Sequence, residues 1–265
     1  HRVNEGVNIA VVAVESVFTT MRMVNNELSD WDYHFDRMKK GVEFLYGPFT
    51  DDEDWALILK NRLETRIQLE SGDKVIRLTI FREQVRGLVQ VGLSSTSDLR
   101  IHLSASHYDR SRIEGRSVNL RTCPARMRPH WWPSFLKAGN YLDTILAQKV
   151  FLRPGDDDLL FLSPGDTVLE SSVANIFIVR HNVLYTSPVG PNVLEGVMRR
   201  KVMEVAETFF KDCIESESSM DQVFKADAIF GTNSIRGPFI VSKVDDHEIK
   251  VPSDFISIFE GLRRR

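Results

Sequence analysis

The sequence FLKAGNYLDTILAQ occupies residues 135–148. Lys137 stands near its start, and the apolar residues that follow recur at helical spacing, which predicts a helix over residues 140–152. A neutral lysine amine is a nucleophile that forms Schiff bases with aldehydes. Lys137 is therefore either a solvated charge at a helix start or the reactive group of a catalytic site. The fourteen residues alone leave both interpretations open.

Length and composition narrow the class of protein. The chain has 265 residues, of which 42% are hydrophobic and 27% charged, a profile typical of one large or two ordinary globular domains. A formal net charge of −3 implies no general affinity for nucleic acid, and no apolar run is long enough to predict a membrane span. Cys123 and Cys213 lie far apart in the sequence, so we expect two reduced thiols in a cytoplasmic protein, although one disulfide stays possible.

The first part of the chain alternates strand and helix patterns. Strand-like runs at 7–14 and 16–24 are followed by helical patterns at 31–47 and 51–72, and by further strand-like runs up to residue 105. The helix at 31–47 places four apolar residues on one face: Phe35, Met38, Val42 and Leu45. Residues 1–105 are therefore predicted to form an antiparallel sheet with two helices.

The second part begins after a polar stretch. Residues 106–117 lack apolar periodicity and are predicted to link two domains. Residues 118–265 combine many short strands with helices at 140–152 and 195–211, which favours a barrel-like sheet. The expected fold class is α+β with two domains.

Two stretches of the second part carry groups that suit a phosphorylated heterocycle. Glu170 ends one predicted strand and Asn175 opens the next, and a carboxylate beside a ring nitrogen keeps that nitrogen protonated. Gly196 leads directly into a helix, where the N–H groups of Val197 and Met198 would favour phosphate. Each feature has an ordinary alternative, a turn acid in the first case and a plain helix start in the second.

Two further stretches add possible phosphate ligands. Asn233 and Ser234 follow a strand in DAIFGTNS, and Arg37 lies beside His34 on the predicted helix HFDRMKK. The sequence contains no GxGxxG, GxSxG, Walker or HExxH motif, and its histidines are scattered. Neither a metal site nor a dinucleotide site is predicted.

The order of these motifs resembles that of the pyridoxal-phosphate enzymes of fold type IV, also called class IV aminotransferases. The resemblance covers nearly the whole chain, from HFDRMKK through FLKAGNYLDTILAQ, LESSVANIFIV and LEGVMRRKV to ADAIFGTNS. It implies pyridoxal 5′-phosphate as cofactor, a small-molecule amino substrate, a homodimer, and an internal aldimine on Lys137, which also transfers protons. It assigns Glu170 to the pyridine nitrogen. The remaining implied cofactor contacts are Arg37, Tyr141, Asn175, Gly196, Val197, Met198, Asn233 and Ser234.

Within the family, SVFTTMRM, Asn233 and Ser234 resemble the aminodeoxychorismate lyases. This implies β-elimination from 4-amino-4-deoxychorismate to 4-aminobenzoate and pyruvate, a step of folate biosynthesis. Arg82 and Arg86 either hold a substrate carboxylate or are strand-edge charges. The alternatives are an aminotransferase for branched-chain or D-amino acids and a relative without turnover, since residues 13–16 depart from the family's Gly-Asp-Gly turn.

Overall fold

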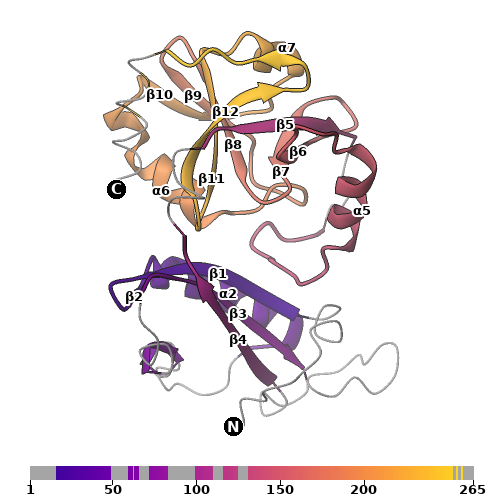
Figure 1. Ribbon diagram of the computed structural model, residues 1–265. Helices are drawn as coiled ribbons and strands as arrows, with labels where there is room; N and C mark the ends of the chain where they lie inside the picture. Colours follow the sequence, from indigo (N-terminus) through magenta and orange to yellow (C-terminus); the bar gives the residue numbers. More distant parts are fainter. Residues whose placement is uncertain are drawn as a thin grey trace. The chain divides into compact units, whose positions relative to one another are not determined.

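The computed structural model describes residues 16–48, 59–61, 63–65, 72–82, 99–109, 116–124, 131–252, 255 and 258 (Figure 1). The chain forms two compact units, the first of His1–Asp109 with Phe135–Tyr141 and the second of Arg110–Ser134 with Leu142–Arg265. The border after Asp109 falls inside the predicted linker 106–117. The return of Phe135–Tyr141, which carries Lys137, to the first unit was not predicted.

The first unit contains an antiparallel sheet. Its described strands have the order β2 (Glu27–Leu28), β1 (Ser16–Val24), β3 (Lys74–Arg82) and β4 (Leu99–His107). The register pairs Thr20 with Arg77. The predicted antiparallel sheet is confirmed. The predicted strand at 7–14 and most of the predicted helix at 51–72 lie outside the described residues.

Helix α2 (Trp31–Tyr46) packs against β1. The approach is close, because a Cβ on Gly41 would lie 3.0 Å from a methyl carbon of Val17. The predicted apolar face is only partly right: Met38 and Val42 are buried, whereas Phe35 and Leu45 are half-buried.

Two polar side chains lie on the buried face of α2 in their place. His34 and Arg37 are both buried, and both form hydrogen bonds with Thr19 of β1. The buried face of α2 therefore contains two polar residues beside the apolar ones, because Thr19 of β1 supplies a hydrogen-bond partner for both.

The second unit closes six strands into a barrel. In order around it lie β8 (Asn175–Arg180), β11 (Ala228–Asn233), β12 (Gly237–Val244), β5 (Val118–Cys123), β6 (Asp158–Leu162) and β7 (Val168–Ser171). Pairing of Glu170 with Asn175 joins β7 back to β8 and closes the ring. Strands β9 (Val183–Thr186), β10 (Asp212–Glu215) and β13 (His247–Glu248) extend this sheet. The predicted barrel-like sheet and α+β class are confirmed.

Three helices accompany the barrel in the described part of the chain: α5 (Leu142–Phe151), α6 (Val197–Val205) and α7 (Met220–Phe224). The predicted helix at 195–211 is shorter than expected. After α6 the chain tightens into a 3₁₀ turn, η2 (Ala206–Thr208), because the amides of Phe209 and Phe210 both donate to the carbonyl of Ala206. None of the helices within the described ranges is long and apolar enough to cross a membrane.

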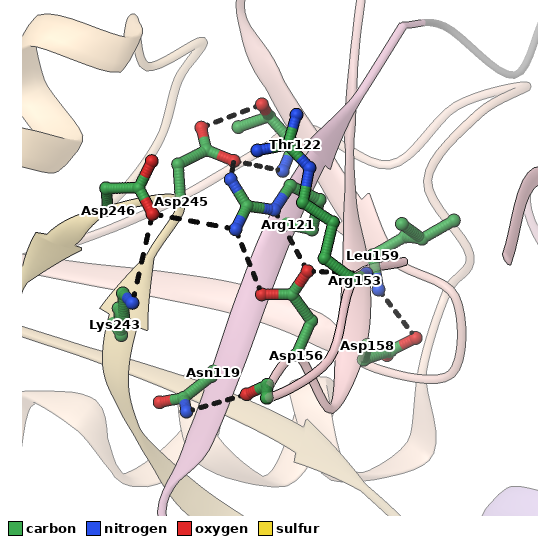
Figure 2. Close-up of polar contacts among 11 residues, drawn as sticks. Asn119, Arg121, Thr122, Arg153, Asp156, Asp158, Leu159, Lys243, Asp245 and Asp246 are labelled. Atoms are coloured by element: carbon green, nitrogen blue, oxygen red, sulfur yellow. Dashed lines mark hydrogen bonds and ion pairs between the residues drawn. The ribbon is translucent and has the colours of Figure 1, made fainter. Parts of the chain in front are cut away.

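The barrel core is mostly aliphatic and contains a stacked phenylalanine pair, and a charged cluster surrounds Arg121 of β5. Phe177 and Phe230 are fully buried and stacked with centroids 5.0 Å apart. On β5, the Arg121 guanidinium donates both to Asp156, at 3.0 and 3.2 Å, and to Asp245, at 3.2 Å (Figure 2). This cluster ties β5 to two loops. Cys123 and Cys213 are free thiols, as predicted.

Candidate active site

Lys137 is held at the edge of the first unit's sheet by its own backbone. Its carbonyl accepts from the Phe18 amide at 3.0 Å, and the Gly139 amide donates to the Ser16 carbonyl at 2.9 Å. Ala138 forms an antiparallel bridge with Val17 between these two bonds. Residues 137–139 therefore run beside β1 as a short extra strand, which fixes the backbone from which the lysine side chain projects.

The Lys137 amine lies among aromatic side chains. Nζ is 2.9 Å from the Tyr141 hydroxyl and 4.8 Å from the centroid of the Phe18 ring. Phe18 and Tyr141 meet edge to face, with centroids 5.6 Å apart. The structure thus brings together Lys137 and Tyr141, which the sequence predicted as neighbours at the cofactor, and holds the amine against Phe18.

Arg37 lies on the opposite face of β1. Its Nη2 donates to Thr19 Oγ1 at 3.2 Å, and the same hydroxyl lies 2.6 Å from Nδ1 of His34. Because side chains alternate along a strand, Thr19 and Phe18 point to different faces. Strand β1 therefore contacts both predicted cofactor ligands of this unit, because Thr19 bonds to Arg37 and Phe18 packs against Lys137.

Glu170 and Asn175 form a buried polar pair in the second unit. The Glu170 Oε2 accepts from the Leu194 amide at 2.8 Å and from Asn175 Nδ2 at 3.3 Å. The Asn175 amide also donates to the Leu194 carbonyl at 2.8 Å. Asn175 thus orients Glu170 and the approach to α6.

The start of α6 is built to approach Asn175 closely. A Cβ on Gly196 would lie 2.0 Å from Asn175 Oδ1, so only glycine fits there. No side chain caps the helix, and its first turn contains no acidic residue. The N–H groups of Val197 and Met198 and the positive end of the helix dipole are thus oriented to favour an anion.

Thr232, near the end of β11, supplies a further possible phosphate ligand. Thr232 pairs across the ladder with Asn175, so both side chains lie on the same face of the barrel wall. Its Oγ1 is buried and has no hydrogen-bond partner. The predicted ligand Asn233 instead accepts the amides of Ile235 and Arg236 at 3.0 and 2.8 Å, which shapes the turn that contains Ser234.

The two arginines predicted to bind substrate contribute no described side chain. Arg82 ends β3, where its backbone pairs with Leu99, and Arg86 lies outside the described residues. Arg77 contacts the same ring as the lysine: its guanidinium carbon is 3.7 Å from the Phe18 centroid. Desolvation lowers the pKa of Arg77, and attraction to Tyr141 partly offsets this. The register of β1 with β3 pairs Arg77 with Thr20, and because these strands lie far apart in the chain no local sequence pattern identifies Arg77.

These groups fit the chemical parts of pyridoxal phosphate. Within the first unit, a lysine amine with a phenol partner suits the aldehyde, and a buried guanidinium suits the phosphate. In the second unit, a hydrogen-bonded buried carboxylate suits a protonated ring nitrogen. The uncapped helix start beside Gly196 and the unpartnered Thr232 hydroxyl suit phosphate oxygens.

Comparison with known proteins gives the family. The model of the family described as amino-transferase class IV matches residues 16–244. The aminodeoxychorismate lyase of Vibrio harveyi is 25% identical over 239 residues, which are 89% of this chain and 86% of that protein.

Two solved structures share the fold. The 4-amino-4-deoxychorismate lyase of Pseudomonas aeruginosa has a TM-score of 0.77 at 23% identity, covering 94% of this chain and 90% of that one. The branched-chain aminotransferase of Thermoproteus uzoniensis has a TM-score of 0.79 at 24% identity, covering 94% and 84%. As predicted, the chain belongs to amino-transferase class IV, a family of enzymes that use pyridoxal phosphate.

Proposed function

We propose that the protein is a pyridoxal-phosphate-dependent 4-amino-4-deoxychorismate lyase that releases 4-aminobenzoate and pyruvate, a reaction of folate biosynthesis. The observation that carries this proposal is the similarity to the Vibrio harveyi lyase over 89% of the chain. The lyase-like stretch SVFTTMRM and the residues Asn233 and Ser234 support it. The fold itself does not discriminate, because the lyase and the aminotransferase structures have TM-scores of 0.77 and 0.79.

The cofactor would supply an electron sink for negative charge at the substrate carbon that bears the amine. Lys137 would hold the cofactor through Nζ and then move protons with the same atom, while the Tyr141 hydroxyl at 2.9 Å orients that amine. Loss of the proton from the amine-bearing ring carbon and departure of the enolpyruvyl group from the neighbouring carbon would give both products.

The other predicted residues would bind and orient. Glu170, held by the Leu194 amide and Asn175, would accept a hydrogen bond from the protonated ring nitrogen. The phosphate contacts would be Arg37, the amides of Val197 and Met198, the turn with Asn233 and Ser234, and the Thr232 hydroxyl.

Arg77 would bind a carboxylate of the substrate. Its guanidinium and the Lys137 amine both contact the Phe18 ring, at 3.7 and 4.8 Å from the centroid. A guanidinium recognises carboxylates with two parallel hydrogen bonds. Among the arginines whose side chains the structure describes, Arg77 is therefore our candidate in place of Arg82. Arg86 stays a prediction from the sequence.

The reaction can be tested with purified protein. We expect release of pyruvate, detected with lactate dehydrogenase, together with 4-aminobenzoate, detected by its fluorescence, when aminodeoxychorismate is supplied. No transfer from branched-chain or D-amino acids to 2-oxoglutarate should occur. Transfer without pyruvate release would establish the aminotransferase alternative, and absence of both activities in cofactor-loaded protein would favour a relative without turnover.

We also propose that the protein is a homodimer whose copies meet through α5. Its outer face is apolar and exposed, with Leu142 62%, Leu146 52% and Val150 72% accessible. Antiparallel pairing of two copies about Leu146 would set Asp143 opposite the partner subunit's Lys149, so this face is self-complementary in charge.

Cross-linking tests this contact. Leu146→Cys in a Cys213→Ser background should form a disulfide-linked dimer on oxidation, whereas Val173→Cys, at a site 56% exposed, should not. A monomeric mass of the untreated protein at micromolar concentration would contradict the dimer.

The free thiols of Cys123 and Cys213 support the proposed cytoplasmic location.

A further inference from the structure

One buried hydroxyl joins the predicted phosphate ligand Arg37 to a histidine that has no role in the proposed chemistry. Thr19, His34 and Arg37 are 0%, 1% and 7% exposed. Thr19 Oγ1 lies 3.2 Å from Arg37 Nη2 and 2.6 Å from His34 Nδ1. All three residues lie between β1 and α2, within the first unit.

Counting hydrogens restricts how these bonds are made. A guanidinium only donates, so the Thr19 oxygen accepts from Arg37. A hydroxyl has a single hydrogen, and the short contact to His34 Nδ1 is satisfied when that hydrogen points to the ring. The three groups then form one directed chain, from Arg37 to Thr19 to His34, in which each bond polarises the next.

The opposite direction is less favourable. If His34 Nδ1 donated to Thr19, the threonine oxygen would accept from both partners, and its own hydrogen would have to leave the chain. A charged imidazole would also place a second buried cation beside the Arg37 guanidinium, at the cost of desolvation and repulsion. We therefore assign the chain to a neutral His34 with its hydrogen on Nε2, an atom that is buried without a hydrogen-bond partner.

We propose that Thr19 and His34 are positioning residues that fix the direction of the Arg37 guanidinium for phosphate. Threonine is stiff about χ1, and His34 fixes the hydroxyl rotor, so the two together fix the acceptor that Arg37 meets. The five donors of a guanidinium lie in one rigid plane, and fixing one nitrogen directs the others. This inference rests on the proposed phosphate role of Arg37.

Affinity for the cofactor with and without its phosphate tests the inference. Apo-protein is titrated with pyridoxal phosphate and with pyridoxal, and the ratio of the two Kd values reports the contribution of the phosphate. Thr19→Val keeps the branched shape and removes the hydroxyl, so the ratio should fall about tenfold while the pyridoxal Kd stays unchanged. Thr19→Ser restores the hydroxyl and should restore the ratio. A merely structural defect would weaken both ligands alike.

Arg37→Gln distinguishes the phosphate role of Arg37 from the positioning role of Thr19 and His34. If Arg37→Gln lowers the ratio and Thr19→Val does not, the positioning role is wrong and the phosphate role of Arg37 stands. If neither variant changes the ratio, the phosphate role is wrong, and the positioning role falls with it.

A measurement on the unmutated protein covers the case in which Thr19→Val does not fold. Nitrogen-15 NMR of the protein should show His34 with an unprotonated Nδ1 and a protonated Nε2. A protonated Nδ1 at neutral pH would overturn the directed chain.

Discussion

The close approach of α6 to Asn175 makes Gly196→Ala the most informative single substitution. The backbone at Gly196 has φ −73° and ψ 139°, which any residue adopts, so alanine meets no conformational penalty there. Its Cβ would lie 2.0 Å from Asn175 Oδ1, a distance at least about 1 Å shorter than an ordinary van der Waals contact. Either the helix start or the Asn175 side chain must move.

The cost follows from the bonds that Asn175 would lose. Its amide donates to the Leu194 carbonyl at 2.8 Å and to the Glu170 carboxylate at 3.3 Å. A neutral hydrogen bond contributes about 1 kcal/mol and one to a charged group about 1.5–3 kcal/mol, so we expect a loss of about 2–4 kcal/mol in the free energy of unfolding. The melting temperature should fall by on the order of 5–10 °C.

Cofactor binding should suffer as well, because the same movement displaces Glu170 and the amides at the start of α6. Thermal denaturation and titration with pyridoxal phosphate measure the two effects. Gly190→Ala is the matched control, since a Cβ there meets nothing within 4 Å and should change neither.

The double variant Asn175→Ala/Gly196→Ala tests the cause. Removing Oδ1 makes room for the new methyl group, so the double variant should be no less stable than Asn175→Ala alone. Additive losses, or a Gly196→Ala protein that matches the unmutated one in stability and affinity, would refute the steric reasoning.

Three other outcomes follow from the described contacts. Glu170→Gln should lower turnover by about 10²-fold in steady-state assays while Lys137 still captures the cofactor, because an uncharged amide cannot stabilise charge on the ring nitrogen. Unchanged turnover would show that Glu170 does not have that role. Burial alone would raise the pKa of Asp156, but hydrogen bonds from Arg121 and the Arg153 amide bring that pKa below its ordinary value. Asp156→Ala should therefore lower the free energy of unfolding by about 1–2 kcal/mol at pH 7, since Arg121 keeps its contact with Asp245. In urea denaturation that deficit should be complete above the unfolded-state pKa of about 3.9 and vanish as pH falls through the lower folded-state pKa; a pH-independent deficit would contradict it. Burial raises the pKa of both thiols, and Cys123 is only 1% exposed, so a thiol reagent at pH 8 should label Cys213 first and Cys123 only on unfolding.

Much of the architecture was predictable from apolar patterns. The runs DLLFL and NIFIVR read as buried strands and form β6 and β8 of the barrel. Strand β10, with the sequence DCIE, and helix α7, MDQVF, were missed because both are too short to show an apolar periodicity. Their stability comes from pairing with β9 and from the Ser219–Gln222 capping box, which a scan for apolar periodicity does not detect.

The site was predictable where its chemistry lies in sequence order, and not where it depends on tertiary neighbours. Glu170 and Asn175 flank a tight turn, so their proximity follows from the hairpin. The hydrogen-bonding roles of Thr19 and Thr232 depend on tertiary neighbours, because a threonine in a strand becomes informative only when its hydroxyl partners, or their absence, are known. Arg77 was missed for the same reason, since its link to Lys137 passes through the ring of Phe18.

The proposed function depends on Lys137 as the residue that carries the cofactor. Protein loaded with pyridoxal phosphate should be yellow, and borohydride should bleach it and leave a phosphopyridoxyl group on the peptide that contains Lys137, as read by mass spectrometry. Lys137→Ala should show no such modification. A phosphopyridoxyl group on another lysine, or equal labelling of Lys137→Ala, would contradict the account.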